Sequence, residues 1–220
     1  MTRELRIQAH GVELHGLLAV PDGAEGAVVF AHGSGSARHS PRSQLIARAL
    51  GDAGLATLLV DLMTPHEERL DRHTRALRFD IEWLADRVIA VTHWMRLYGA
   101  PGVPLGYLGA STGAAAALVA AAREPYAIGA IVARSGRPDL AGAALEHVRA
   151  PTLLVVGGHD DALLERNRDA YHRIHATKAF EIVEPGSDEH VARLALEWFT
   201  RHLADAADTR PDLGPASSHF

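Results

Sequence analysis

Short, mostly apolar runs recur along this chain, and helical patterns fill much of the sequence between them. Continuous apolar runs are typical of strands that are covered on both faces, as in a parallel sheet. Parallel strands also need long crossovers, which the intervening helices supply. The pattern therefore predicts an α/β fold, a mostly parallel sheet with helices on both faces. The predicted strands are residues 27–33, 55–62, 103–109, 127–135, 150–160 and 179–186.

Residues 3–20 alternate in polarity on either side of Gly11, which predicts a hairpin of two strands before the first apolar run. Apolar residues from Ile81 onward step by three and four, so a helix capped by Asp80 is expected to end near Gly99. Residues 65–78 are charged and only loosely patterned. We expect one domain over residues 1–203 and a disordered tail over 204–220.

Composition excludes several classes of function. The net charge is −5, which does not favour a nucleic acid or an anionic membrane as partner. The chain has no cysteine, so it forms no disulfide and uses no thiolate. It shows no apolar run long enough to span a membrane and no signal-peptide pattern, so we expect a cytoplasmic protein. Its 14 histidines lack metal-site spacing, and we expect no metal.

The segment "GYLGASTGAAAALVA" places Ser111 between a strand and an alanine-rich helix. The pattern G-x-S-x-G at such a junction is typical of a nucleophile elbow, in which a strained turn presents the serine oxygen at its apex. The alternative is a Gly/Ser-rich turn that only connects the two elements. The strand before and the helix after favour a catalytic Ser111, with the backbone N–H of Thr112 facing a developing oxyanion.

A serine nucleophile needs a base and an orienting acid, which follow it in the order acid, then histidine. Asp160 comes directly after a predicted strand and is the favoured acid, although the neighbouring Asp161 can take its place. Either carboxylate can instead cap the next helix. His190 follows the last strand and is the candidate base, or else a solvated residue in the first turn of the last helix.

The loop "FAHGSGSARHS" follows the first apolar strand and offers a second oxyanion donor, from the backbone near Ser34 and Gly35. It lacks the Gly-Lys-Ser/Thr of a phosphate-binding P-loop. His32, Arg38 and His39 in or beside this loop are candidates to line the pocket. Arg38 can bind a carboxylate or phosphate of a substrate, although a surface arginine is the commoner outcome.

With these motifs the chain resembles the α/β-hydrolase superfamily, and within it the small dienelactone-hydrolase-like branch. The resemblance covers the chain up to about Leu203. It implies an eight-stranded sheet without a large cap, a small ester or lactone as substrate, no cofactor, and a catalytic Ser111 and Asp160. True dienelactone hydrolases carry cysteine at the elbow, so Ser111 indicates a serine esterase. The motifs are "VVFAHGSGSARHSPRS", "LGYLGASTGAAAALVAAA", "ARSGRPDL", "APTLLVVGGHDDALLERN" and "VARLALEWFTRHL".

One departure from the family pattern concerns the base. Relatives carry a Pro-Gly-Ala-Thr-His segment after the last strand and a second Pro-Gly before the last helix, whereas here there is one, Pro185-Gly186. Aligned from the strand, His190 is the base displaced by one residue. Aligned from the helix, the histidine loop is missing. We therefore expect a serine hydrolase, with two alternatives: a protein without a base that binds a ligand, or His32 as the base.

Overall fold

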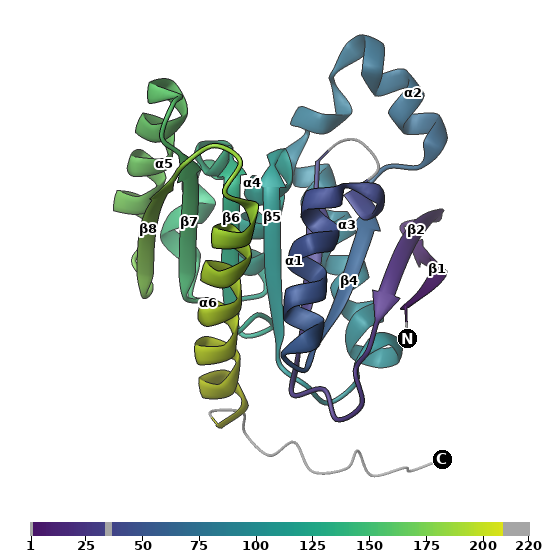
Figure 1. The fold of residues 1–220 in the computed structure, drawn as a ribbon. Coiled ribbons are helices and arrows are strands. Elements are labelled where there is room, and N and C mark those ends of the chain that lie inside the picture. The colour runs from purple at the N-terminus through teal and green to yellow at the C-terminus, as the bar shows by residue number, and fades with distance from the viewer. Residues whose placement is uncertain (1, 34–36, 209–220) are drawn as a thin grey trace.

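The computed structural model describes residues 2–33 and 37–208, which form an eight-stranded sheet in the order β1-β2-β4-β3-β5-β6-β7-β8 (Figure 1). This order brings β5, which ends at Ser111, to an interior position between β3 and β6. The strands are β1 (Thr2–Ala9), β2 (Val12–Ala19), β3 (Gly26–His32), β4 (Leu55–Asp61), β5 (Leu105–Ser111), β6 (Ala130–Gly136), β7 (Thr152–Gly157) and β8 (Lys178–Val183).

The pairing confirms the mostly parallel sheet and the N-terminal hairpin. β1 pairs antiparallel with β2, and β2 pairs antiparallel with β4. The six strands β3 to β8 are all parallel to one another. The hairpin turns through His10 and Gly11, both at positive φ. Because parallel strands end at the same edge, the residues that follow β3, β5, β6, β7 and β8 share the carboxyl edge of the sheet.

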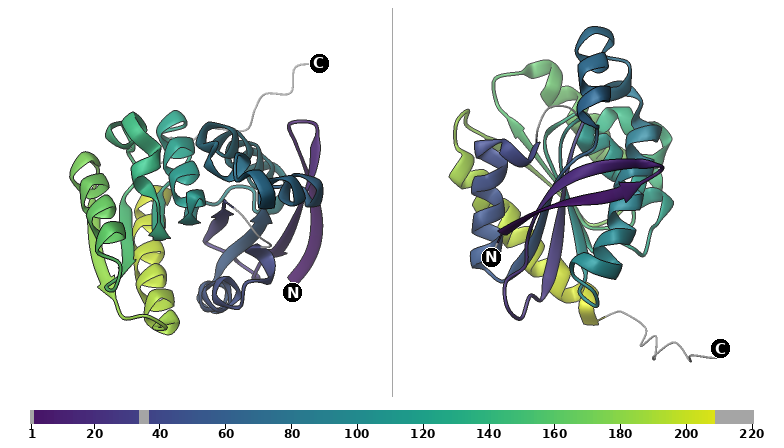
Figure 2. Two further views of the ribbon diagram at one scale, coloured as in Figure 1. Left: turned by 90° about the horizontal axis from the view of Figure 1, so that it is seen from above. Right: turned by 90° about the vertical axis from the view of Figure 1, so that its right-hand side faces the viewer.

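Helices cover both faces of the sheet, as predicted (Figure 2). On one face α1 packs against α6, over a core that includes Phe30, Leu108 and Phe199. On the other face α3, α4 and α5 lie over a core that includes Tyr107 and Leu154. The helices are α1 (Pro41–Asp52), α2 (Pro65–Thr74), α3 (Ile81–Trp94), α4 (Thr112–Arg123), α5 (Asp161–Arg173) and α6 (Asp188–Asp208), with shorter turns η1 (Ala37–His39), η2 (Leu77–Phe79), η3 (Met95–Gly99) and η4 (Pro138–His147).

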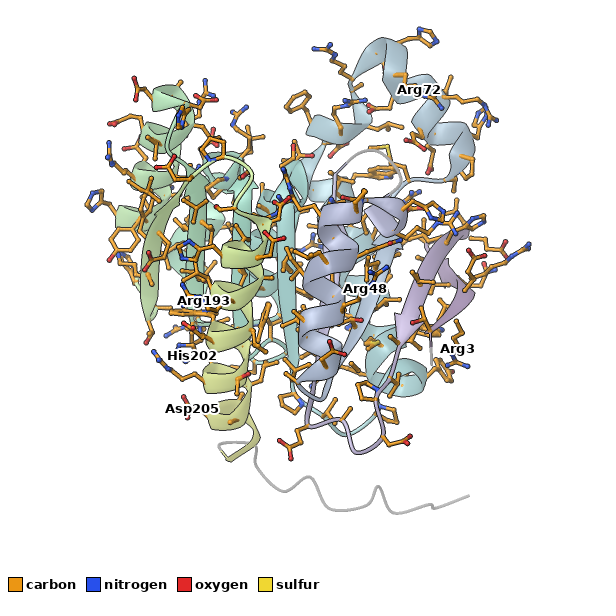
Figure 3. All side chains as sticks on the ribbon, viewed as in Figure 1. Arg3, Arg48, Arg72, Arg193, His202 and Asp205 are labelled. Carbon is orange, nitrogen blue, oxygen red and sulfur yellow. The ribbon has the colours of Figure 1, made fainter. Side chains whose placement is uncertain are left out.

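Residues 65–79 form the largest projection beyond the carboxyl edge, α2 followed by η2 (Figure 1). Thr64 and Glu67 form a capping box that starts α2. The buried Arg87 of α3 then holds the helix, because its guanidinium donates two hydrogen bonds of 2.7 Å to the Glu67 carboxylate. Arg72, on the same helix, lies far from the sheet (Figure 3). Within the described residues this short projection is the only structure resembling a cap.

The last helix is longer than the sequence indicated. α6 continues to Asp208, so residues 204–208, which we assigned to the tail, are helical because the helix begun at Asp188 is not interrupted. The remaining tail, 209–220, lies outside the described residues. In the part of the chain that is described, no helix is both long and apolar enough to cross a membrane.

We predict that Glu67→Gln makes the free energy of unfolding less dependent on pH below neutral pH. Burial raises the pKa of Glu67, but hydrogen bonds from Arg87 and Thr64 outweigh burial and leave the pKa below its ordinary value of 4.5. A lowered pKa gives stability that is present above pH 4.5 and is lost as the pH falls through the folded value. When the free energy of unfolding in urea is plotted against pH between pH 7 and pH 3, the fall toward acid should therefore be shallower for Glu67→Gln than for wild type.

The matched control is Glu82→Gln on α3. The Glu82 carboxylate lies 3.5 Å from Arg123 and is largely exposed, so its ion pair is screened. Glu82→Gln should therefore keep the wild-type dependence of the unfolding free energy on pH. The same dependence in wild type and Glu67→Gln would contradict the anchoring of α2 through the Glu67–Arg87 pair.

Candidate active site

Ser111 sits at the junction of β5 and α4 in a strained backbone conformation. Its φ is +52° and its ψ is −131°, a combination that a residue with a side chain rarely adopts. A serine at this position usually caps the helix, but the Ser111 hydroxyl makes no capping hydrogen bond and is exposed. The junction therefore presents a serine hydroxyl to solvent instead of using it to start the helix.

The small residues around Ser111 are required by close packing of backbone on backbone. A Cβ at Gly113 would overlap the carbonyl oxygen of Ala31 on β3, and one at Gly109 would lie 2.5 Å from Cα of Ala114. A Cβ at Gly33 would overlap Oγ1 of Thr112. The three glycines thus let β3, β5 and the start of α4 approach within distances that any side chain would prevent.

Of the residues predicted to supply oxyanion donors, Thr112 lies within the described part of the chain. Thr112 is the first residue of α4, where backbone N–H groups have no partner within the helix. Gly33 packs against Thr112, so the segment that leaves β3 begins beside the N-terminus of α4. Ser34 and Gly35 lie outside the described residues.

Asp160 and Asp161 are both exposed at the carboxyl edge, after β7. Asp160 is the N-cap of α5, and its Oδ1 accepts a hydrogen bond of 2.9 Å from the N–H of Leu163. The capping role considered from the sequence is therefore present. Its other carboxylate oxygen, Oδ2, accepts no hydrogen bond from the described residues, so the orienting role of Asp160 stays a prediction.

His190 lies in the first turn of α6 and is exposed. Only residues 184–187, which include Pro185 and Gly186, separate β8 from this helix. Pro185 and Gly186 thus lie one residue from the strand and one residue from the helix, and both alignments of this segment stay open. Over residues 2–33 and 37–208, no hydrogen bond connects Ser111, Asp160 and His190, so their joint action as a triad also stays a prediction.

His32 ends β3 and turns toward α1. Its Nε2 lies 3.0 Å from Oγ of the buried Ser43. Burial, with a smaller contribution from the nearby charge of Arg134, lowers the pKa of His32 to about 4. His32 is therefore neutral at neutral pH, and the nitrogen that bonds Ser43 is not available to Ser111.

The other two pocket candidates differ from each other. Arg38 Nε donates a hydrogen bond of 2.7 Å to the carboxylate of Asp61, so its charge is already balanced and it is not an open anion-binding group. His39 is exposed. The described residues bring no group of three histidine or acidic side chains together as metal ligands.

Sequence reasoning did not single out Arg134, which the structure buries beside the elbow. Arg134 is 8% exposed and pairs in register with Ala110, the residue before Ser111. The signal was present, because a lone arginine within the apolar run "AIGAIVARS" has no ordinary reason to be buried.

Comparison with known proteins defines the class. No family model matches the chain. It is 47% identical to a dienelactone hydrolase from Anabaena variabilis, with a TM-score of 0.88 over 92% of this chain and 98% of that one. The chain therefore belongs to the dienelactone hydrolase family and has its α/β-hydrolase fold. Est1E from Butyrivibrio proteoclasticus shares the fold at 15% identity, with a TM-score of 0.75 over 91% of this chain and 99% of that one.

A curated relative from Mycobacterium tuberculosis is 51% identical over 211 residues, or 91% of this chain. Its name assigns it provisionally to the phosphoribosyl transferases. The match covers 46% of that relative, so the chain spans less than half its length. The name describes a protein about twice as long.

We predict that Ser111→Gly stabilises the protein by about 1 kcal/mol, because glycine adopts positive φ without strain. The matched control is Ser40→Gly, since Ser40 caps α1 by accepting a hydrogen bond from Ser43 N–H and lies at negative φ. That change should stabilise nothing and cost a few tenths of a kcal/mol. Chemical denaturation of both variants checks this. A loss of stability in Ser111→Gly would contradict the strained elbow.

His32→Gln should remove a pH dependence of stability. The pKa of His32 in the folded chain, about 4, lies below the ordinary 6.5. Between these pH values His32 therefore binds a proton in the unfolded chain but not in the folded chain. Wild-type stability should fall by up to roughly 3 kcal/mol as the pH drops from 6.5 to 4. Urea unfolding across that range should show less of this fall in His32→Gln, whereas the exposed His39→Gln should keep it.

Proposed function

We propose that this protein is a serine hydrolase that cleaves a carboxylic ester or a lactone without a cofactor. The observation that carries the proposal is Ser111, which is strained, exposed and not used as a helix cap. Strain of this size persists only where surrounding packing imposes it, and it is common at catalytic residues. Membership of the dienelactone hydrolase family supports the same reaction class.

In the proposed reaction, Ser111 Oγ attacks the carbonyl carbon of the substrate while His190 takes the hydroxyl proton. Asp160 orients His190 and stabilises its charged form. The backbone N–H of Thr112 and one N–H from the loop after β3 hold the negative oxygen. His190 then passes its proton to the leaving alcohol. Water, activated by the same histidine, releases the carboxylic acid and restores Ser111.

A second candidate function is ligand binding by a hydrolase fold that has lost its base. The short connection of residues 184–187 and the exposed position of His190 in a helix favour it. In that case the elbow and the donors at Thr112 would hold a carbonyl compound without cleaving it.

Steady-state hydrolysis of p-nitrophenyl esters, aryl lactones and a feruloyl ester separates the two functions. The feruloyl ester is included because Est1E has been solved with ferulic acid bound. A serine hydrolase should lose at least about 1000-fold in kcat/KM in Ser111→Ala, and about 100-fold or more in His190→Ala. His172→Ala, which changes an exposed histidine on α5, is the control and should keep full activity.

Loss of activity in Ser111→Ala but not in His190→Ala would move the base elsewhere. A folded wild type that cleaves none of these compounds would favour the binding function.

A further inference from the structure

The end of β6 contains one residue more than the strand beside it. Ala110 on β5 pairs with Arg134. The next residue on β5, Ser111, pairs with Gly136, so Ser135 is left without a partner on that strand. An extra residue of this kind is a β-bulge, and bulges are frequent beside active sites, where they redirect a side chain. This bulge lies directly opposite the elbow.

The bulge exposes the side chain of Ser135. Along a regular strand, side chains on one face are two residues apart. Ala133 belongs to the core beneath α3 and α4. Gly136, three residues later, faces α4 as well, because a Cβ on it would overlap Cβ of Ala114. One residue between them therefore falls outside the alternation. Ser135 is that residue, and it is the only exposed residue of β6.

The backbone of Ser135 is also strained. Its φ is +43°, in the left-handed region that favours glycine. Among the described residues, four that are not glycine have positive φ, and two of them, Ser111 and Ser135, stand on neighbouring strands at the same edge. The other two, His10 and Arg75, lie at a hairpin turn and at a helix end, where positive φ is ordinary. Strain beside the elbow is typical of a functional position.

Hydrogen bonds to the neighbouring backbone hold the bulge in place. The N–H of Arg137 donates a hydrogen bond of 3.0 Å to the carbonyl oxygen of Ser111. Nδ2 of the buried Asn167, on α5, donates one of 3.1 Å to the carbonyl oxygen of Gly136. Over residues 2–33 and 37–208 the Ser135 hydroxyl itself makes no hydrogen bond. The backbone thus positions this side chain and leaves its hydroxyl for a ligand.

We propose that Ser135 is a specificity-determining residue, whose hydroxyl forms a hydrogen bond with a hydroxyl group on the acyl chain of the substrate. The inference rests on the proposed function of Ser111 and names a substrate class for it, esters of short 3-hydroxy acids. A serine hydroxyl is uncharged and both donates and accepts hydrogen bonds, so it matches a neutral hydroxyl. Ser135 binds in this account and does not attack.

The position of the bulge determines which substituent Ser135 can reach. In the proposed reaction the carbonyl oxygen turns toward Thr112 and the β3 side of the elbow, which leaves the acyl chain to extend toward β6. Adjacent strands are about 4.8 Å apart. A hydroxyl on the third carbon of the acyl chain can span this gap while Ser111 is bonded to the first.

Hydrolysis of p-nitrophenyl butyrate and of p-nitrophenyl 3-hydroxybutyrate tests the proposal. In wild type, kcat/KM should be about 5-fold or more higher for the preferred enantiomer of the hydroxy ester, the size expected of one neutral hydrogen bond. In Ser135→Ala the ratio of the two values should fall to about 1. Alanine keeps the Cβ and hence the backbone strain, so this change reports the loss of the hydroxyl alone.

Two further variants separate the hydroxyl from the strain. Ser135→Gly should also lose the preference, while its melting temperature should rise because glycine adopts positive φ without strain. The matched control is Ser40→Ala, since the Ser40 hydroxyl already accepts a hydrogen bond from the N–H of Ser43. Ser40→Ala should keep the wild-type ratio.

Binding of uncleaved amides separates this inference from the proposed hydrolysis. Ser111→Ala forms no acyl-enzyme, and in an NMR titration it should bind 3-hydroxybutyramide about 5-fold or more tightly than butyramide. The double variant Ser111→Ala/Ser135→Ala should bind the two amides equally. If wild type cleaves neither ester but the amide preference is present and depends on Ser135, the hydrolase proposal fails and the role of Ser135 stands.

Three results would overturn the role of Ser135. The first is an equal kcat/KM of wild type for the two esters, and the second is a preference that survives Ser135→Ala. The third, where no ester is cleaved, is that Ser111→Ala binds neither amide or binds both equally.

Discussion

The close approach of β3, β5 and the first turn of α4 is the constraint on which the carboxyl edge depends. Gly33, Gly109 and Gly113 allow it, since a side chain on any of them would meet backbone or Thr112. The chain must then turn from strand to helix within one residue, and Ser111 takes the strained conformation that this turn requires. The position of the hydroxyl, the N-terminus of α4 and the start of the loop after β3 all follow from this packing.

Charge around the elbow is arranged unevenly. On the β4 side, Arg38 is neutralised by Asp61, and on the α6 side Arg42 is neutralised by Asp188. Between them lie a neutral His32 and an unpaired Arg134. The edge thus combines an exposed nucleophile with a buried positive charge. The opposite end of α6, where His202 and Asp205 lie, is remote from this arrangement (Figure 3).

Local patterns in the sequence were enough to predict the sheet and the elbow. The geometry of the elbow can be predicted from the G-x-S-x-G segment alone, because the glycines that permit the turn lie close to the serine in sequence. α2 was missed although its signal was present, in Thr64 and Glu67 with a proline at the first helical position. The charged composition of residues 65–78 concealed it.

The positions of Arg134 and of the His32–Ser43 contact could not be predicted in the same way. That Arg134 stands beside Ala110, and that Ser43 reaches His32, depends on strand register and on the docking of α1, which no short segment encodes. Asp160 and His190 are placed by local rules as a helix cap and a first-turn residue. Whether they also act on Ser111 depends on a geometry that the sequence pattern does not contain.

Labelling with a fluorophosphonate, followed by peptide mapping, tests most directly the claim that the elbow presents a reactive serine. We predict one adduct per chain, on Ser111, and none in Ser111→Ala. Ser135 is an internal control, since it is also exposed and at positive φ but does not begin a helix, and it should stay unmodified. A folded wild type that forms no adduct, or forms it on another serine, would show that the elbow does not present a reactive Ser111.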